Sequence, residues 1–131
     1  MLNSPLKISK IDAGNYLKGL MLLIRKDHEV TEAEKSLLKR IGKSLGFEQE
    51  FCENTIDQIL NNKFVEDTPP VFKEKELAVK FIKDGLAVIF SDDKIHPAEE
   101  NWLIAAAEKN DIDIINFYEL KKNIQLCAII L

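Results

Sequence analysis

The chain has 131 residues, of which 46% are hydrophobic and 31% are charged, and its 22 acidic and 18 basic residues give a net charge of −4. This length fits one domain that folds without a metal ion or a disulfide, and the negative charge argues against nucleic-acid binding and favours a cationic or protein partner. Because the sequence has neither a secretory signal nor an apolar run near the ~20 residues of a membrane-spanning helix, we expect a cytoplasmic protein.

Three helices are predicted in the first half of the chain. The first begins near Ser9 and runs to Lys26, with apolar side chains at helical spacing. The second begins at the capping box Thr31-Glu-Ala-Glu34 and ends at Gly46, a residue typical of a left-handed helix cap. The third spans about 48–62 and is expected to bury Phe51, Cys52, Ile56, Ile59 and Leu60.

A linker and three more helices are predicted in the second half. The paired prolines Pro69 and Pro70 cannot lie inside a helix. Helices are predicted at about 73–90 and at about 113–126. Between them another helix begins at Pro97, because proline is favoured at the first position of a helix. The last helix is expected to bury Ile115, Phe117, Leu120 and Ile124.

The second half of the sequence repeats the first with a shift of 65 in residue number, as from Asp27 to Asp92. The register in the third helix of each half is open, because a shift of 66 pairs Phe51 with Phe117. Elsewhere the shift of 65 needs no gap, and it pairs Val30, Glu34 and Leu38 with Ile95, Glu99 and Leu103.

This repetition predicts the architecture. No segment alternates apolar and polar residues as a half-buried strand would, so we predict an all-α single domain of six or seven helices. Two helical repeats, at about 10–62 and 73–128, would be joined by a linker at 63–72. We expect a pseudo-two-fold axis between the repeats, since each can bury its apolar face against the other.

Both repeats carry the motif Asp-x-x-(Val/Ile)-x-x-x-Glu, which contains Asp27 and Glu34 in the first and Asp92 and Glu99 in the second. The Asp ends one helix or starts the turn, and the Glu lies in the first turn of the next helix. Both carboxylates can then face one loop, and hard cations prefer such oxygen ligands. These four acids are the candidate ligands of a divalent metal ion.

Other residues of the two loops bear on the choice of metal. His28, His96 and Asp93 are candidate helpers, and an imidazole beside two carboxylates favours zinc or manganese over calcium. Loop histidines are, however, more often surface residues than ligands. The loops are not EF-hands, because positions upstream of the Asp that need oxygen ligands hold residues such as Arg25 and Phe90.

A second interpretation of the motif needs no metal. Glu34 would be the capping-box partner of Thr31, and Glu99 would be an acid that the helix dipole favours in a first turn. Both interpretations stay open at the level of the sequence.

The motif resembles that of the tellurite-resistance TerB-like domain, which is also the N-terminal part of membrane-anchored J-domain co-chaperones. That family has Asp-Gly-x-Ile-x-x-x-Glu between two helices in each of two related halves, and the resemblance covers about 16–111. It implies an all-helical fold, acidic clusters associated with divalent metal ions, and a role in stress response or in complexes near membranes. This chain has His28 and Asp93 where the family has glycine, and His96-Pro97-Ala98 lacks the acid of the J-domain signature.

Two functions are therefore expected. One is a non-enzymatic acidic module of stress response that binds calcium, manganese or zinc; the other is a protein-interaction or scaffold domain without a metal. An enzyme is not expected, because the chain has no Gly-rich phosphate loop, no Glu-x-x-His pair and no nucleophile triad.

The segment from Cys127 to Leu131 is apolar. We expect it to pack in the core, and a homodimer contact or a fragment boundary are the alternatives. Cys52 and Cys127 are expected to be reduced core thiols, since they form no Cys-x-x-Cys motif.

Overall fold

The computed structural model describes residues 10–25, 32–61, 68–90 and 97–130. These residues form no strand and six packed helices, which are α1 (Lys10–Arg25), α2 (Glu32–Ser44), α3 (Gln49–Asn61), α4 (Lys75–Phe90), α5 (Pro97–Lys109) and α6 (Ile114–Ile130). The predicted all-α fold is confirmed for this part of the chain. None of these helices is both long and apolar enough to cross a bilayer.

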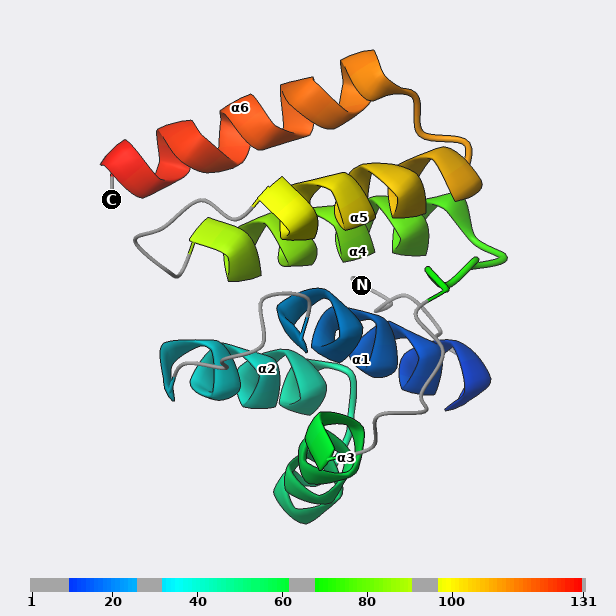
Figure 1. The fold of residues 1–131 in the computed structure, drawn as a ribbon, viewed down its shortest axis with the longest axis vertical. Coiled ribbons are helices and arrows are strands. Elements are labelled where there is room, and N and C mark those ends of the chain that lie inside the picture. Colours follow the sequence, from blue (N-terminus) through cyan, green and yellow to red (C-terminus); the bar gives the residue numbers. More distant parts are fainter. Residues whose placement is uncertain (1–9, 26–31, 62–67, 91–96, 131) are drawn as a thin grey trace, which may run out of the picture.

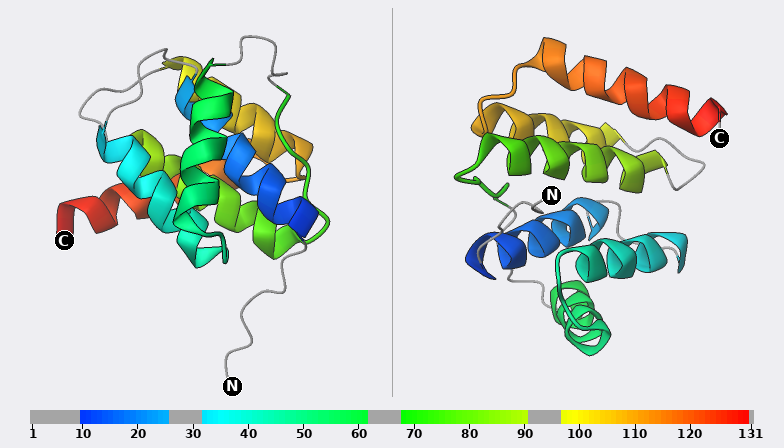
Figure 2. Two further views of the ribbon diagram at one scale, coloured as in Figure 1. Left: turned by 90° about the horizontal axis from the view of Figure 1, so that it is seen from below. Right: turned by 180° about the vertical axis from the view of Figure 1, so that it is seen from behind.

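Helices α1 and α4 pack against each other at the centre of the molecule (Figure 1). On one side α2 and α3 pack on α1, and on the other α5 and α6 pack on α4. Contacts of α1 with α5 and of α2 with α4 join the two halves further. The view from behind shows the same order, with α3 and α6 at opposite ends (Figure 2). One continuous apolar core therefore runs through both halves.

Equivalent helices of the two halves begin at positions related by the shift of 65, since α1, α2 and α3 start at Lys10, Glu32 and Gln49 and α4, α5 and α6 start at Lys75, Pro97 and Ile114. The third helices follow the same shift. Cys52 and Phe117, which it pairs, are both fully buried. The structure thus favours a shift of 65 over a shift of 66 in these helices.

Two residues predicted to lie in the core are exposed instead. The exposed fraction is 47% for Phe51 and 70% for Ile115. Phe51 lies about 100° around the helix from its buried neighbour Cys52, and Ile115 lies about 200° from the buried Phe117. An apolar residue near a helix start can therefore point to solvent while its neighbours define the buried face.

Helix α2 ends in a Schellman motif, as the glycine in the sequence predicted. Gly46 has a φ of 93°, in the left-handed region. The Phe47 N–H donates to the Gly42 carbonyl at 3.0 Å, and the Gly46 N–H donates to the Lys43 carbonyl at 3.0 Å. These two bonds satisfy carbonyls that the end of a helix otherwise leaves without partners.

Helix α5 ends in the same motif, but with an aspartate at the left-handed position. Asp111 has a φ of 62°. The Ile112 N–H donates to the Ala107 carbonyl at 2.9 Å, and the Asp111 N–H donates to the Glu108 carbonyl at 3.1 Å. The shift of 65 pairs Asp111 with Gly46, so the two halves share the cap while only one has the residue that suits it best.

We expect the substitution Asp111→Gly to raise the free energy of unfolding by about 0.5–1 kcal/mol, because glycine adopts a positive φ without the steric cost of a Cβ. The reciprocal substitution Gly46→Asp should lower it by a similar amount. Urea unfolding of the two variants measures both values. Loss of stability in Asp111→Gly would contradict the assignment of left-handed strain to this residue.

Aromatic side chains fill the contact between α1 and α4. Tyr16 and Phe81, which the shift of 65 pairs, meet edge to face with ring centroids 5.2 Å apart. Phe72 lies 5.7 Å from the Tyr16 ring and 5.3 Å from the Phe81 ring, and Trp102 lies 6.3 Å from the Phe81 ring. A Cβ on Gly19 would lie 2.8 Å from the Phe81 ring, so a glycine is needed for this close approach.

The segment before α4 is fixed by the buried Asn110. The Asn110 Oδ1 accepts the Phe72 N–H at 2.9 Å, and Nδ2 donates to the carbonyls of Pro70 at 2.9 Å and Ala106 at 2.8 Å. Residues 68–72 of the predicted linker 63–72 contain no helix, and 63–67 lie outside the described residues. This part of the linker is thus a packed element, since Phe72 is buried in the core.

Candidate functional site

The two motif glutamates are buried at equivalent places. The exposed fraction is 2% for Glu34 and 1% for Glu99, and both carboxylate oxygens of Glu99 are out of contact with solvent. Each is the third residue of its helix. One helical turn later come Leu38 and Leu103, which are also buried. The glutamates therefore occupy the first position of the core-facing stripe, where an apolar residue would be the ordinary choice.

The helix ends that flank the two loops lie on the same side of the molecule. Helices α1 and α4 end there, and α2 and α5 begin there, at the left in Figure 1 and at the right in the rear view of Figure 2. The dipoles of α2 and α5 thus place two positive helix N-termini at this side. The sequence could not give this placement, because it depends on how the halves pack.

The other predicted ligands, Asp27, Asp92, His28, Asp93 and His96, lie outside the described residues, as do the two loops that hold them. Within the described ranges no three His, Cys, Asp or Glu side chains cluster in a way that could hold a metal ion. Of the four predicted acids, the structure therefore places Glu34 and Glu99.

Burial decides what these two glutamates can do. An acid that served only the helix dipole could stay in water, whereas burying a carboxylate is costly unless cations or hydrogen-bond donors compensate it. Carboxylate oxygens suit calcium, magnesium or manganese. They also suit a capping box, in which a third-position glutamate accepts a backbone N–H from the preceding loop. Either role fixes a loop to its helix.

A polar group formed by Tyr16, Lys80 and Asp84 lies within the contact of α1 with α4, and sequence reasoning missed it. The buried Tyr16 hydroxyl donates to Asp84, whose Oδ2 also accepts from the Lys80 Nζ at 2.7 Å. The Lys80 Nζ lies 3.4 Å from the Tyr16 oxygen and 5.1 Å from the centroid of its ring. Burial, and then the charge of Asp84 and the hydrogen bond to it, raise the pKa of Tyr16 above its ordinary value. The hydroxyl is therefore protonated and joins α1 to α4.

The sequence held one signal for this group. Lys80 and Asp84 are charged residues four positions apart on a helix that is otherwise mostly apolar. Their partner Tyr16 lies 68 residues before Asp84, and no local pattern connects the two.

Cys52 is a free, buried thiol, as predicted. Burial, followed by the negative charge of Glu53, raises the pKa of this thiol. It is therefore a poor nucleophile at neutral pH. The side chain of Cys127 lies outside the described residues.

The chain was compared with protein-family models, with curated proteins and with solved structures. None of the three comparisons found a match.

Proposed function

We propose that this chain is a non-enzymatic helical module that binds a divalent metal ion at its two acidic loops. Asp27 and Glu34 would hold the ion in the first half, and Asp92 and Glu99 in the second. The observation that supports this most is the burial of Glu34 and Glu99 at equivalent positions. Burying a carboxylate is costly, and both motif glutamates nevertheless lie on the core-facing side of their helices. This supports a role in which each binds a cation, because a carboxylate without such a role could stay at the surface.

The resemblance to the TerB-like domain extends this proposal. The two halves would be copies of one unit related by a pseudo-two-fold axis, in keeping with the equivalent starts of their helices and with the same hydrogen-bond pattern at the C-termini of α2 and α5. By analogy with that family, the module would act in a cytoplasmic stress response of the tellurite-resistance type.

The loop residues would determine which metal ion the site prefers. Carboxylates alone favour calcium, and participation of His28 or His96 would favour manganese or zinc. Titration calorimetry with the three ions separates these cases, because only the zinc or manganese site should weaken when a histidine is replaced by alanine.

We expect the double variant Glu34→Gln and Glu99→Gln to lower the affinity for the metal by about tenfold or more, because it removes a charged oxygen ligand from each loop and keeps the side-chain shape. Calorimetry and thermal unfolding measure the effect. For the unaltered chain, metal at about a hundredfold excess over Kd should raise the free energy of unfolding by about 2.7 kcal/mol.

The matched control is Glu32→Gln. Glu32 lies in the same first turn as Glu34, but its side chain is 92% exposed. Its variant should bind metal as the unaltered chain does. If calcium, manganese and zinc each gave no heat of binding and no thermal shift, the proposed function would be excluded.

A protein-interaction or scaffold domain without a metal is the second candidate. The observation that favours it is a group of exposed apolar side chains on α6, namely Ile114, Ile115 and Tyr118. Its partner would be another protein or a second copy of this chain. Such binding should persist in a chelator and weaken in Ile115→Ser, whereas the metal-dependent module should lose its partner when the ion is removed.

A further inference from the structure

Helix α6 forms one end of the molecule, with α4 and α5 on its inner side (Figure 1, Figure 2). No other described helix packs on it. Phe117 on the inner side is fully buried, whereas the exposed fraction is 48% for Ile114, 70% for Ile115 and 48% for Tyr118. A helix that is apolar on both sides normally buries both. The outer side of α6 is therefore suited to a further contact.

Helix α3, the equivalent of α6 in the first half, shows that the fold does not require this apolar surface. It forms the opposite end of the molecule and packs on α1 and α2 as α6 packs on α4 and α5. At the places of Ile114, Ile115, Tyr118 and Lys122 it has Gln49, Glu50, Glu53 and Asp57. These three acids make the α3 end unsuited to self-association, because two copies of it would repel each other. The apolar surface of α6 is thus a property of this helix alone.

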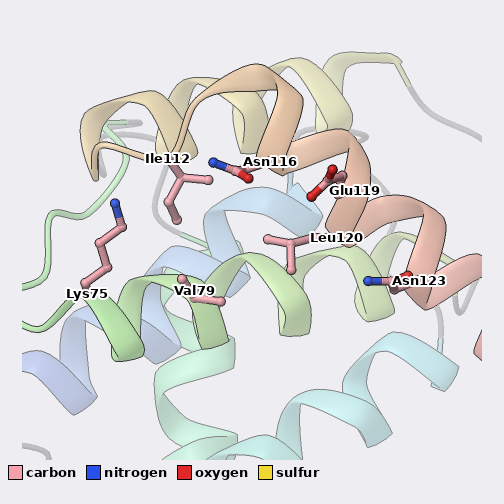
Figure 3. Close-up of a pocket in the computed structure, with 7 residues that line it drawn as sticks. All are labelled: Lys75, Val79, Ile112, Asn116, Glu119, Leu120 and Asn123. Carbon is pink, nitrogen blue, oxygen red and sulfur yellow. The ribbon is translucent and has the colours of Figure 1, made fainter.

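Two charged residues of opposite sign lie beside the exposed apolar side chains of α6. Glu119 and Lys122 are both exposed, and they are three positions apart on the helix. They form no ion pair with each other or with another described residue. Figure 3 shows Glu119 on α6, beside a cavity of about 210 Å³ that lies between α6 and α4. Both charges are therefore available to a partner.

We propose that the outer side of α6 binds a second copy of this chain, with the two α6 helices antiparallel about a two-fold axis. When the axis passes midway between positions 119 and 122, each Glu119 faces the partner's Lys122, and two equivalent ion pairs form. Ile115 of each copy lies one helical turn away from these pairs, against the partner helix. A two-fold contact requires a surface that is complementary to itself, and an acid and a base on one helix face meet that requirement.

The expected dimer is weak. Helix α6 has 17 residues and is therefore about 25 Å long. Two such helices side by side give a contact at the low end of interface sizes, and we expect a Kd on the order of 100 µM. This proposal rests on the second candidate function, the interaction domain, and it does not involve the metal ion of the first.

The test is sedimentation equilibrium in a chelator, at chain concentrations from about 10 to about 500 µM, which span the expected Kd. The unaltered chain should show a monomer–dimer equilibrium. Glu119→Lys and Lys122→Glu should each weaken the dimer by about tenfold or more, because like charges then face each other in both pairs. An equimolar mixture of the two variants should regain the dimer, since opposite charges face each other again. The double variant with both changes should dimerise as the unaltered chain does.

Asp57→Lys is the control, at the place on α3 equivalent to Lys122. It changes the net charge as much as Glu119→Lys does and should leave the dimer unchanged. All three positions are exposed, so thermal unfolding should show that the variants keep their fold.

A chain that stays monomeric at the highest concentration would overturn the proposal, and so would a dimer that both single charge variants leave intact. Calorimetry with calcium, manganese and zinc on the same chain separates this result from the metal-binding function. A monomer that still binds one of these ions would refute the dimer alone.

Discussion

Replacing Phe81 by alanine is expected to lower the free energy of unfolding by about 3–5 kcal/mol, the range for loss of a fully buried phenylalanine. Phe81 has no exposed surface and contacts three aromatic rings, those of Tyr16, Phe72 and Trp102. These rings come from α1, from the segment before α4 and from α5, so the cavity would open where both halves meet. A domain of this size is stable by only about 5–15 kcal/mol, and chemical unfolding should resolve the loss easily.

Gly19, which lies against the Phe81 ring, allows a more specific test of this contact. Ala at position 19 would place its Cβ 2.8 Å from the Phe81 ring and 2.9 Å from Pro70, so Gly19→Ala should destabilise the unaltered chain. It should cost less in the Phe81→Ala background, with a coupling energy of about 1 kcal/mol or more. The exposed Phe51, changed to alanine, is the control and should lose about 1 kcal/mol or less. Additive effects of the Gly19 and Phe81 substitutions would contradict this contact.

Asn110→Ala should lower the free energy of unfolding by about 2–4 kcal/mol. The substitution removes three hydrogen bonds and leaves the Phe72 N–H, in a buried residue, without its acceptor, and each buried group left unsatisfied costs about 1–3 kcal/mol. Equilibrium unfolding measures the loss. Hydrogen exchange should also quicken at the Phe72 amide, because its acceptor is gone.

The control for Asn110 is Asn101→Ala. Asn101 is exposed on α5, the helix that ends just before Asn110, and alanine is the better helix former there, so stability should stay the same or rise slightly. If Asn110→Ala behaved like Asn101→Ala, the side chain would not be what fixes the segment before α4.

Local sequence signals predicted the six helices of the described residues correctly. Helical spacing of apolar residues located all six, and Gly46 and Pro97 marked a helix end and a helix start where the structure has them. The shift between the two halves also reappears in the helix starts. These features depend on the few residues around each position, and a single sequence records them directly.

Features that depend on packing could not be predicted in the same way. Asn110 binds residues 38 and 40 positions away, and the cavity between α4 and α6 needs both helices in place. For the candidate site, the motif located Glu34 and Glu99 in first turns, but the helix dipole favours exposed acids there as well. Their burial follows from which face of α2 and α5 meets the core, and that face is set by the fold.

The polar group of Tyr16, Lys80 and Asp84 makes the contact between the two halves asymmetric, because one half supplies the hydroxyl and the other supplies the charged residues. The shift of 65 places Phe81 opposite Tyr16, but it puts Gly19 and Asn15 where the other half has Asp84 and Lys80. Two copies of the first half, meeting as the present halves do, would each bury a phenol hydroxyl with no carboxylate to receive it. The first half therefore relies on the second for the acceptor of its one core hydroxyl at this contact, and it could not replace its neighbour there by a copy of itself.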